Sequence, residues 1–134
     1  MKSRSELREM IMISLYQIYL CDSSNIEYDI EKIIKSIIEE PNDFVNKMVY
    51  GTLENKDIID TTINKYLNNW TVDRLGKTDQ AILRMASYEI LYTDTPGAVI
   101  IDEAIELAKK YSDDKVKNMI NGVLDNILKN EVKK

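Results

Sequence analysis

The stretch that decides the fold is residues 99–127, which read VIIDEAIELAKKYSDDKVKNMINGVLDNI. Apolar residues recur in it every three or four positions, at Ile101, Ala104, Ile105, Ala108, Val116, Ile120, Val123 and Ile127. That spacing places them on one face of an α-helix. Between the two runs stands Ser112-Asp113-Asp114, whose side chains favour a helix N-terminus. The stretch therefore predicts two amphipathic helices, the second buried along one face.

The first part of the chain repeats this helical spacing. Ser3-x-x-Glu6 predicts a capping box at the start of a first helix, which should end near Cys21 because polar turn residues follow. A second helix carries closely spaced isoleucines. Pro41-Asn42-Asp43 should end it and cap a third, since proline restricts the residue before it.

The middle of the chain is less regular. From Phe44 to Leu67 the apolar pattern predicts one long helix, disturbed at Gly51 or around Asn55-Lys56-Asp57. Trp70 should lie in a connector. A short helix should then run from Thr71 to Gly76, and Thr78 should cap the helix that leads towards the loop at Pro96.

Length and composition fit an all-α fold. The chain has 134 residues, with 44% hydrophobic residues, 4 glycines and 2 prolines, which is enough for a core and too few breakers for many β-turns. We expect one domain over residues 1–134, built of about seven helices in two small bundled subdomains. The expected halves are 1–69, with three helices, and 70–134.

The same composition removes most catalytic chemistry. The chain has no histidine and one cysteine, Cys21, so histidine catalysis, cysteine-cluster zinc sites and internal disulfides are excluded. No glycine-rich phosphate loop is present, and neither is a signal peptide or a transmembrane segment. We therefore expect no enzyme, no catalytic residue, no metal, no cofactor, no membrane partner, and a cytoplasmic protein.

Positive charge is scarce, because the net charge is −5. Lys2, Arg4 and Arg8 lie near the N-terminus, interleaved with glutamates, and by themselves they indicate an ordinary solvated helix end. If Lys115 and Lys117 meet them in space, the five would form the one sizeable positive patch, where phosphate could bind.

One further position looks costly for a helix interior. Asn121-Gly122 stands in the middle of the last helical pattern, and glycine there costs about 1 kcal/mol relative to alanine. The sequence therefore predicts that Gly122 lies against another helix with little room for a side chain.

Longer strings of the chain resemble a known family. The run from Val99 to Tyr111, followed by MINGVLD from Met119 to Asp125, resembles the C-terminal signature of the NusB family of transcription antitermination factors. LRMASYEI at 83–90, Pro96, Arg8-Glu9 and SLYQ at 14–17 are similar to the family in the same order and at the same spacings.

This resemblance implies an RNA-binding role without catalysis. Factors of this kind pair with ribosomal protein NusE on boxA RNA, work with other Nus factors and RNA polymerase, and promote read-through of ribosomal RNA operons. The RNA-binding residues it implies are Lys2, Arg4, Arg8, Tyr16, Lys115, Lys117, Asn118 and Met119. The implied partner contacts are Asp79 and Glu89, both expected to be exposed.

Two departures bear on these expectations. Ser5 and Glu6 stand where the family often has positive charge, and Met119 replaces a usual aromatic residue, which weakens base stacking. The alternative function is a non-catalytic helical interaction module, related to the RNA-binding domain of ribosomal RNA methyltransferases. A homodimer that covers the RNA surface stays open.

Overall fold

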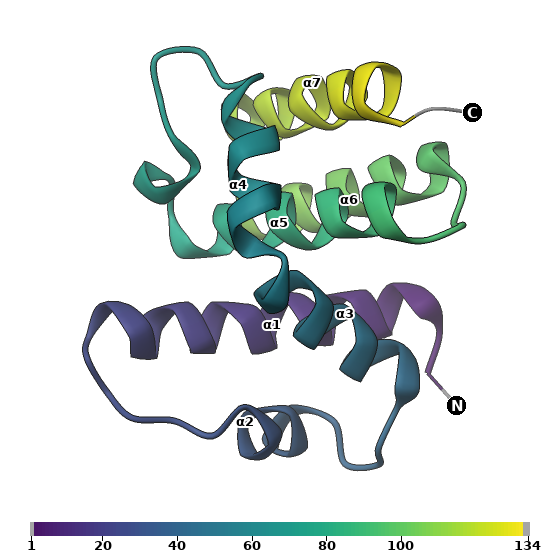
Figure 1. The fold of residues 1–134 in the computed structure, drawn as a ribbon. Helices are drawn as coiled ribbons and strands as arrows, with labels where there is room; N and C mark the ends of the chain where they lie inside the picture. Colours follow the sequence, from purple (N-terminus) through teal and green to yellow (C-terminus); the bar gives the residue numbers. More distant parts are fainter. Residues whose placement is uncertain (1, 133–134) are drawn as a thin grey trace.

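The structure is a computed structural model that describes residues 2–132. Over that range the chain forms seven α-helices and one 3₁₀-helix, and no strand (Figure 1). The elements are α1 Arg4–Ser23, α2 Ile30–Ile37, α3 Asp43–Glu54, α4 Lys56–Asn64, η1 Val72–Arg74, α5 Lys77–Tyr92, α6 Gly97–Tyr111 and α7 Asp114–Glu131. The all-α prediction is confirmed.

The helices form two layers. α1 packs against α2 and α3 in one layer, and α5, α6 and α7 pack against one another in the other (Figure 1). α4 rises from the end of α3 and lies beside α5 and α7. Side chains cap several helices as expected: Ser3 forms the capping box with Glu6, and Asn42 and Asp113 accept backbone N–H bonds at the starts of α3 and α7.

The long helix expected from Phe44 to Leu67 is broken at Asn55. The backbone there has φ −106° and ψ 18°, outside the helical region, and the Asn55 side-chain amide donates to the Gly51 carbonyl at 2.8 Å. An asparagine that bonds to its own backbone competes with the helix. Residues before 69 therefore hold four helices, where three were expected.

Two smaller boundaries also differ. The segment expected as a helix from Thr71 to Gly76 is a single 3₁₀ turn, Val72–Arg74. α5 begins at Lys77 behind Gly76, without a side-chain cap, so the expectation that Thr78 caps this helix is wrong. The helix begins early enough to bring Asp79 into its first turn.

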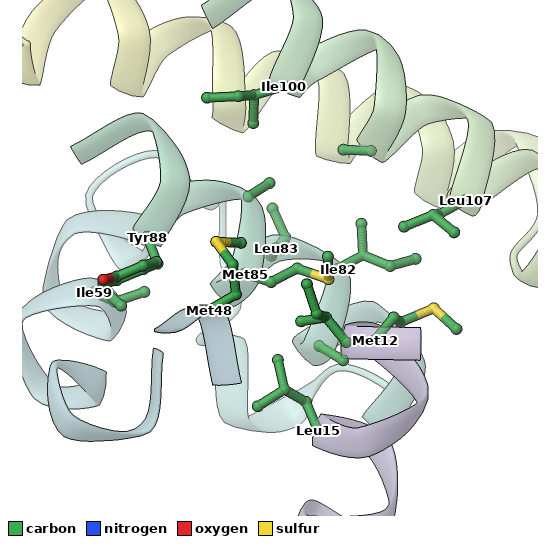
Figure 2. Close-up of a cluster of buried hydrophobic side chains, with 14 of the residues drawn as sticks. Met12, Leu15, Met48, Ile59, Ile82, Leu83, Met85, Tyr88, Ile100 and Leu107 are labelled. Atoms are coloured by element: carbon green, nitrogen blue, oxygen red, sulfur yellow. The ribbon is translucent and has the colours of Figure 1, made fainter. Parts of the chain in front are cut away.

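The centre of the molecule is α5. Every residue of α5 from Gln80 to Ile90 is buried, and the helix packs against α1, α3, α4, α6 and α7. A helix that is buried on all sides belongs in the middle of a core. Figure 2 shows the core around it, with side chains from four other helices: Met12, Leu15, Met48, Ile59, Ile100 and Leu107.

The last helix packs along the face that its spacing predicts. Ile120, Val123 and Ile127 are buried, and Val116 is half-buried. The expectation for Gly122 is wrong, because it is exposed and nothing lies within 4 Å of where its side chain would be. The tight glycines are Gly51, against the Tyr88 ring, and Gly97, against Leu128.

No helix within residues 2–132 is both long and apolar enough to cross a membrane.

Candidate nucleic-acid interface

The N-terminal cations lie at the start of α1. Lys2 and Arg4 are exposed, and the Arg4 guanidinium lies 3.9 Å from the centre of the Phe44 ring. A guanidinium over an aromatic face is held by the ring quadrupole and keeps its outer edge in water. Both side chains are therefore free to meet a phosphate. Tyr16, farther along the same helix, is half-buried.

Arg8 lies inside the molecule. Its Nε and Nη2 donate to the two carboxylate oxygens of Glu89 at 3.0 and 2.6 Å, and Glu103 lies 4.0 Å from Nη1. The hydrogen bonds with Glu89 raise the pKa of Arg8 despite its burial. Arg8 is 5% exposed and Glu89 is 1% exposed. Both were expected at the surface, and both expectations are wrong because each side chain neutralises the other.

An open groove of about 490 Å³ separates α1 from α6. We call it the α1–α6 groove. It is lined by Ser5, Glu6, Glu9, Glu103, Glu106, Leu107, Lys109 and Lys110. Each lysine is paired with a glutamate: Lys110 lies 2.6 Å from Glu9, and Lys109 lies 3.1 Å from Glu106. The Tyr111 hydroxyl also donates to Glu9. Acidic and paired groups fill this surface.

A second groove, of about 600 Å³, lies between α7 and the connector that joins α4 to α5. We call it the Trp70 groove, and its lining is Tyr66, Leu67, Asn68, Trp70, Arg74, Leu75, Gly76, Asp79, Lys115, Val116, Met119, Gly122, Val123 and Asn126. Trp70 is 56% exposed, and the Arg74 guanidinium lies 5.5 Å from its ring centre. Aromatic and positive groups therefore share one hollow surface.

The Trp70 groove collects some of the residues that the sequence suggested. Lys115, Met119 and Asp79 line it, and Asn118 is exposed beside it. Lys117 lies 3.7 Å from Asp114, and Asp79 accepts a hydrogen bond from Ser112. The patch expected from Lys2, Arg4, Arg8, Lys115 and Lys117 loses Arg8, which is buried, and Lys115 lines the Trp70 groove.

Sequence reasoning missed Tyr66, Trp70 and Arg74. The signal was an exposed aromatic with an arginine four residues later in a connector, which is the interleaving that single-stranded nucleic acid sites use. Tyr66 is held at the groove by a 2.5 Å hydrogen bond from its hydroxyl to Glu131.

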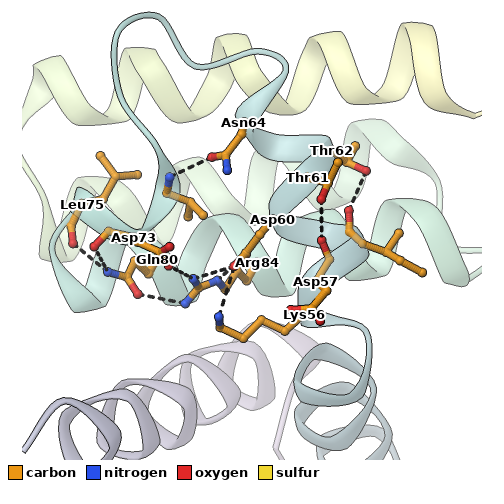
Figure 3. A network of polar contacts seen from close by, with 12 residues as sticks. Lys56, Asp57, Asp60, Thr61, Thr62, Asn64, Asp73, Leu75, Gln80 and Arg84 are labelled. Atoms are coloured by element: carbon orange, nitrogen blue, oxygen red, sulfur yellow. Dashed lines mark hydrogen bonds and ion pairs between the residues drawn. The ribbon is translucent and has the colours of Figure 1, made fainter.

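A polar network centred on the buried Arg84 lies directly behind this connector (Figure 3). Arg84 donates to Asp60 at 2.7 and 3.0 Å, to Asp73 at 3.0 Å and to the Gln80 amide oxygen at 2.8 Å. Burial is the largest single influence on the pKa of Arg84 and lowers it, but Asp60 and Tyr19 together outweigh burial and raise the pKa. Nearby, burial raises the pKa of Tyr19 to about 12. Its ring faces the Arg84 guanidinium at 4.9 Å.

Within residues 2–132 no cluster of three or more carboxylate or thiol side chains could hold a metal ion.

Residues 5–129 match the NusB family. The chain belongs to the NusB family. It is 43% identical over 131 residues to the transcription antitermination protein NusB of Staphylococcus aureus (strain JH9), covering 95% of this chain and 99% of the relative.

Solved structures of the family share the fold. NusB of T. maritima superposes with a TM-score of 0.84 at 34% identity, covering 97% of this chain and 94% of that one. The crystal structure of antitermination factors NusB and NusE in complex with dsRNA gives a TM-score of 0.77 at 27% identity, covering 94% and 96%. The NusB family thus includes a member whose complex places RNA and NusE on this fold.

Proposed function

We propose that this chain is a transcription antitermination factor that binds boxA-type nascent RNA together with ribosomal protein NusE. Through other Nus factors and RNA polymerase it would promote read-through of ribosomal RNA operons, in the cytoplasm, by binding and not by catalysis. The observation that carries the proposal is the Trp70 groove, where an exposed tryptophan, Arg74, Lys115 and Met119 meet in a chain of the NusB family.

Each group in the groove has a plain role toward RNA. A base can stack on Trp70, which is worth roughly 1–3 kcal/mol for a base on an aromatic ring. Arg74 and Lys115 can pair with phosphates. Met119 offers a polarizable apolar side chain where the family has an aromatic one.

Lys2 and Arg4 extend the proposed RNA surface, with Tyr16, Lys117 and Asn118 as further contacts. Asp79 is the proposed contact to NusE, because it lies half-buried at the rim of the groove. Arg8 is not part of the proposed RNA surface, and Glu89 is not a proposed contact to NusE, because the two side chains are buried against each other.

The test is a binding titration of a fluorescent boxA-like RNA, with and without NusE, for the parent chain and for Lys115→Ala. We expect tighter binding with NusE, and a log–log salt slope that is lower by roughly 0.7 in Lys115→Ala because one phosphate contact is lost. Lys110→Ala is the matched control, since Lys110 is paired with Glu9. Equal affinity with and without NusE, or equal salt slopes for both variants, would contradict the proposal.

A further inference from the structure

The connector between α4 and α5 is held in place by several side-chain hydrogen bonds from the helices on either side of it. It carries two exposed groups that line the Trp70 groove, Trp70 and Arg74. Directly before Trp70 the chain turns through Asn69, whose φ of 66° lies in the left-handed region that few residues other than glycine adopt, asparagine among them. Surface connectors are mobile by default, so the bonds that hold this one call for an explanation.

Two amide side chains hold the backbone of the turn. The Val72 N–H donates to Oδ1 of Asn64 at 2.8 Å, which ties the turn to the end of α4. Nε2 of Gln80 donates to the carbonyls of Leu75 and Asp73 at 2.8 and 3.2 Å, which ties it to α5. The Gln80 side chain is buried, so these bonds are shielded from competition by water.

The third anchor is the side chain of Asp73, which accepts from Nη2 of Arg84 at 3.0 Å. Arg84 is 1% exposed and already has a bidentate carboxylate partner in Asp60. The Asp73 side chain is 71% exposed, and an ion pair with so exposed a partner contributes little stability. Its effect is geometric, because it fixes the residue next to Arg74.

We propose that Asn64, Asp73, Gln80 and Arg84 are positioning residues that hold Trp70 and Arg74 in place for RNA before RNA arrives. None of the four needs to touch RNA. A loop fixed in advance loses less conformational entropy on binding, so the anchors raise affinity through Trp70. This inference rests on the proposed function only where it concerns RNA affinity; the rigidity of the connector can be measured without RNA.

The chain supplies its own probe, because Trp70 is its one tryptophan. Asp73→Ala and Asp73→Asn remove the same charge, but only the asparagine keeps an oxygen for Arg84. We expect Asp73→Ala to increase the fast anisotropy decay and acrylamide quenching of Trp70, and Asp73→Asn to leave both near the parent values. Asn64→Ala, which changes no charge, should act like Asp73→Ala, and Asn121→Ala on the exposed face of α7 should not.

In the RNA-binding measurement, the loss of charge and the loss of positioning at Asp73 should change the affinity in opposite directions. Loss of one negative charge alone should tighten RNA binding in both Asp73 variants. Positioning predicts that Asp73→Ala binds about fivefold more weakly than Asp73→Asn, the low end of the cost of one lost base stack. The melting temperatures of the two Asp73 variants should stay close together, since a folding defect would increase the motion of Trp70 and lower the melting temperature alike.

Unchanged Trp70 motion in both Asp73→Ala and Asn64→Ala would overturn the positioning role, whatever RNA does. Equal RNA affinity of Asp73→Ala and Asp73→Asn in a protein that binds RNA would overturn it as well. If the parent chain binds no RNA even with NusE, the proposed function fails, and the fluorescence arm still decides whether these residues fix the connector.

Discussion

The α1–α6 groove and the Trp70 groove each contain two positively charged residues, but they present different surfaces. In the α1–α6 groove Lys109 and Lys110 are paired with glutamates, and Arg8 is buried against Glu89 on the same side of α1. In the Trp70 groove Arg74 lies over an indole ring, and neither Arg74 nor Lys115 forms an ion pair with any residue in the described range 2–132. Positive residues in a sequence therefore become a positive surface only where no carboxylate faces them.

The largest effect should come from reversing Arg8. Arg8→Glu would place a carboxylate opposite Glu89 and Glu103 in a buried site, and breaking a buried ion pair costs about 3–5 kcal/mol. We expect a loss of that order in the free energy of unfolding, measured by urea denaturation. Arg74→Glu in the other groove should change stability by less than about 0.5 kcal/mol. Equal losses in the two variants would erase the distinction between the grooves.

The next effect concerns two exposed aromatic residues, Trp70 in the Trp70 groove and Tyr111 beside the α1–α6 groove. Trp70→Ala should weaken binding of boxA-like RNA by roughly 1–3 kcal/mol, because one stacking surface is lost. Tyr111→Ala should leave RNA affinity unchanged, since Tyr111 donates its hydroxyl to Glu9 beside the acidic groove. Fluorescence titration of both variants in the presence of NusE measures this difference. Weaker RNA binding by Tyr111→Ala would instead place the RNA surface beside the α1–α6 groove.

A smaller effect tests how open the Trp70 groove is. Nothing lies within 4 Å of a side chain at Gly122, so Gly122→Ala should raise the free energy of unfolding by about 0.5–1 kcal/mol through helix propensity. Gly51→Ala should lower stability, because its methyl group would collide with the Tyr88 ring. Thermal unfolding of the two variants checks both signs. A destabilised Gly122→Ala would mean that α7 is closely packed there.

The smallest effect is a pH dependence in the α1–α6 groove. Hydrogen bonds from Lys110 and Tyr111 lower the pKa of Glu9 below its ordinary 4.5. A carboxyl whose pKa is lower in the folded state stabilises the fold above the unfolded value, and this contribution is lost as the pH falls through the folded value. Glu9→Gln should therefore melt slightly below the parent chain at pH 7 and level with it at about pH 3. A constant gap at both pH values would show that the bonds from Lys110 and Tyr111 do not lower the pKa of Glu9.

The fold was largely readable from the sequence, and the site only in part. Helical spacing predicted the elements, and the disturbance around Asn55 is where α3 ends and α4 begins. Arg8 and Glu89 are 81 positions apart, so no local pattern could indicate that they neutralise each other. Lys115 was found through its charge and Met119 through family resemblance, whereas Trp70 and Arg74 depend on how the connector folds back over α7. Local periodicity reports which face is apolar, and it does not report which charges meet.

The complete burial of α5 has a consequence for how the molecule opens. The backbone amides of Gln80–Ile90 are surrounded by five other helices, so local fraying cannot expose them to solvent. Their deuterium exchange should proceed through whole-molecule opening alone, and their protection factors should give the same free energy as urea denaturation. The amides of α2, an eight-residue helix with one buried residue, should exchange orders of magnitude faster. One exchange experiment would thus read the stability of the whole chain from its central helix.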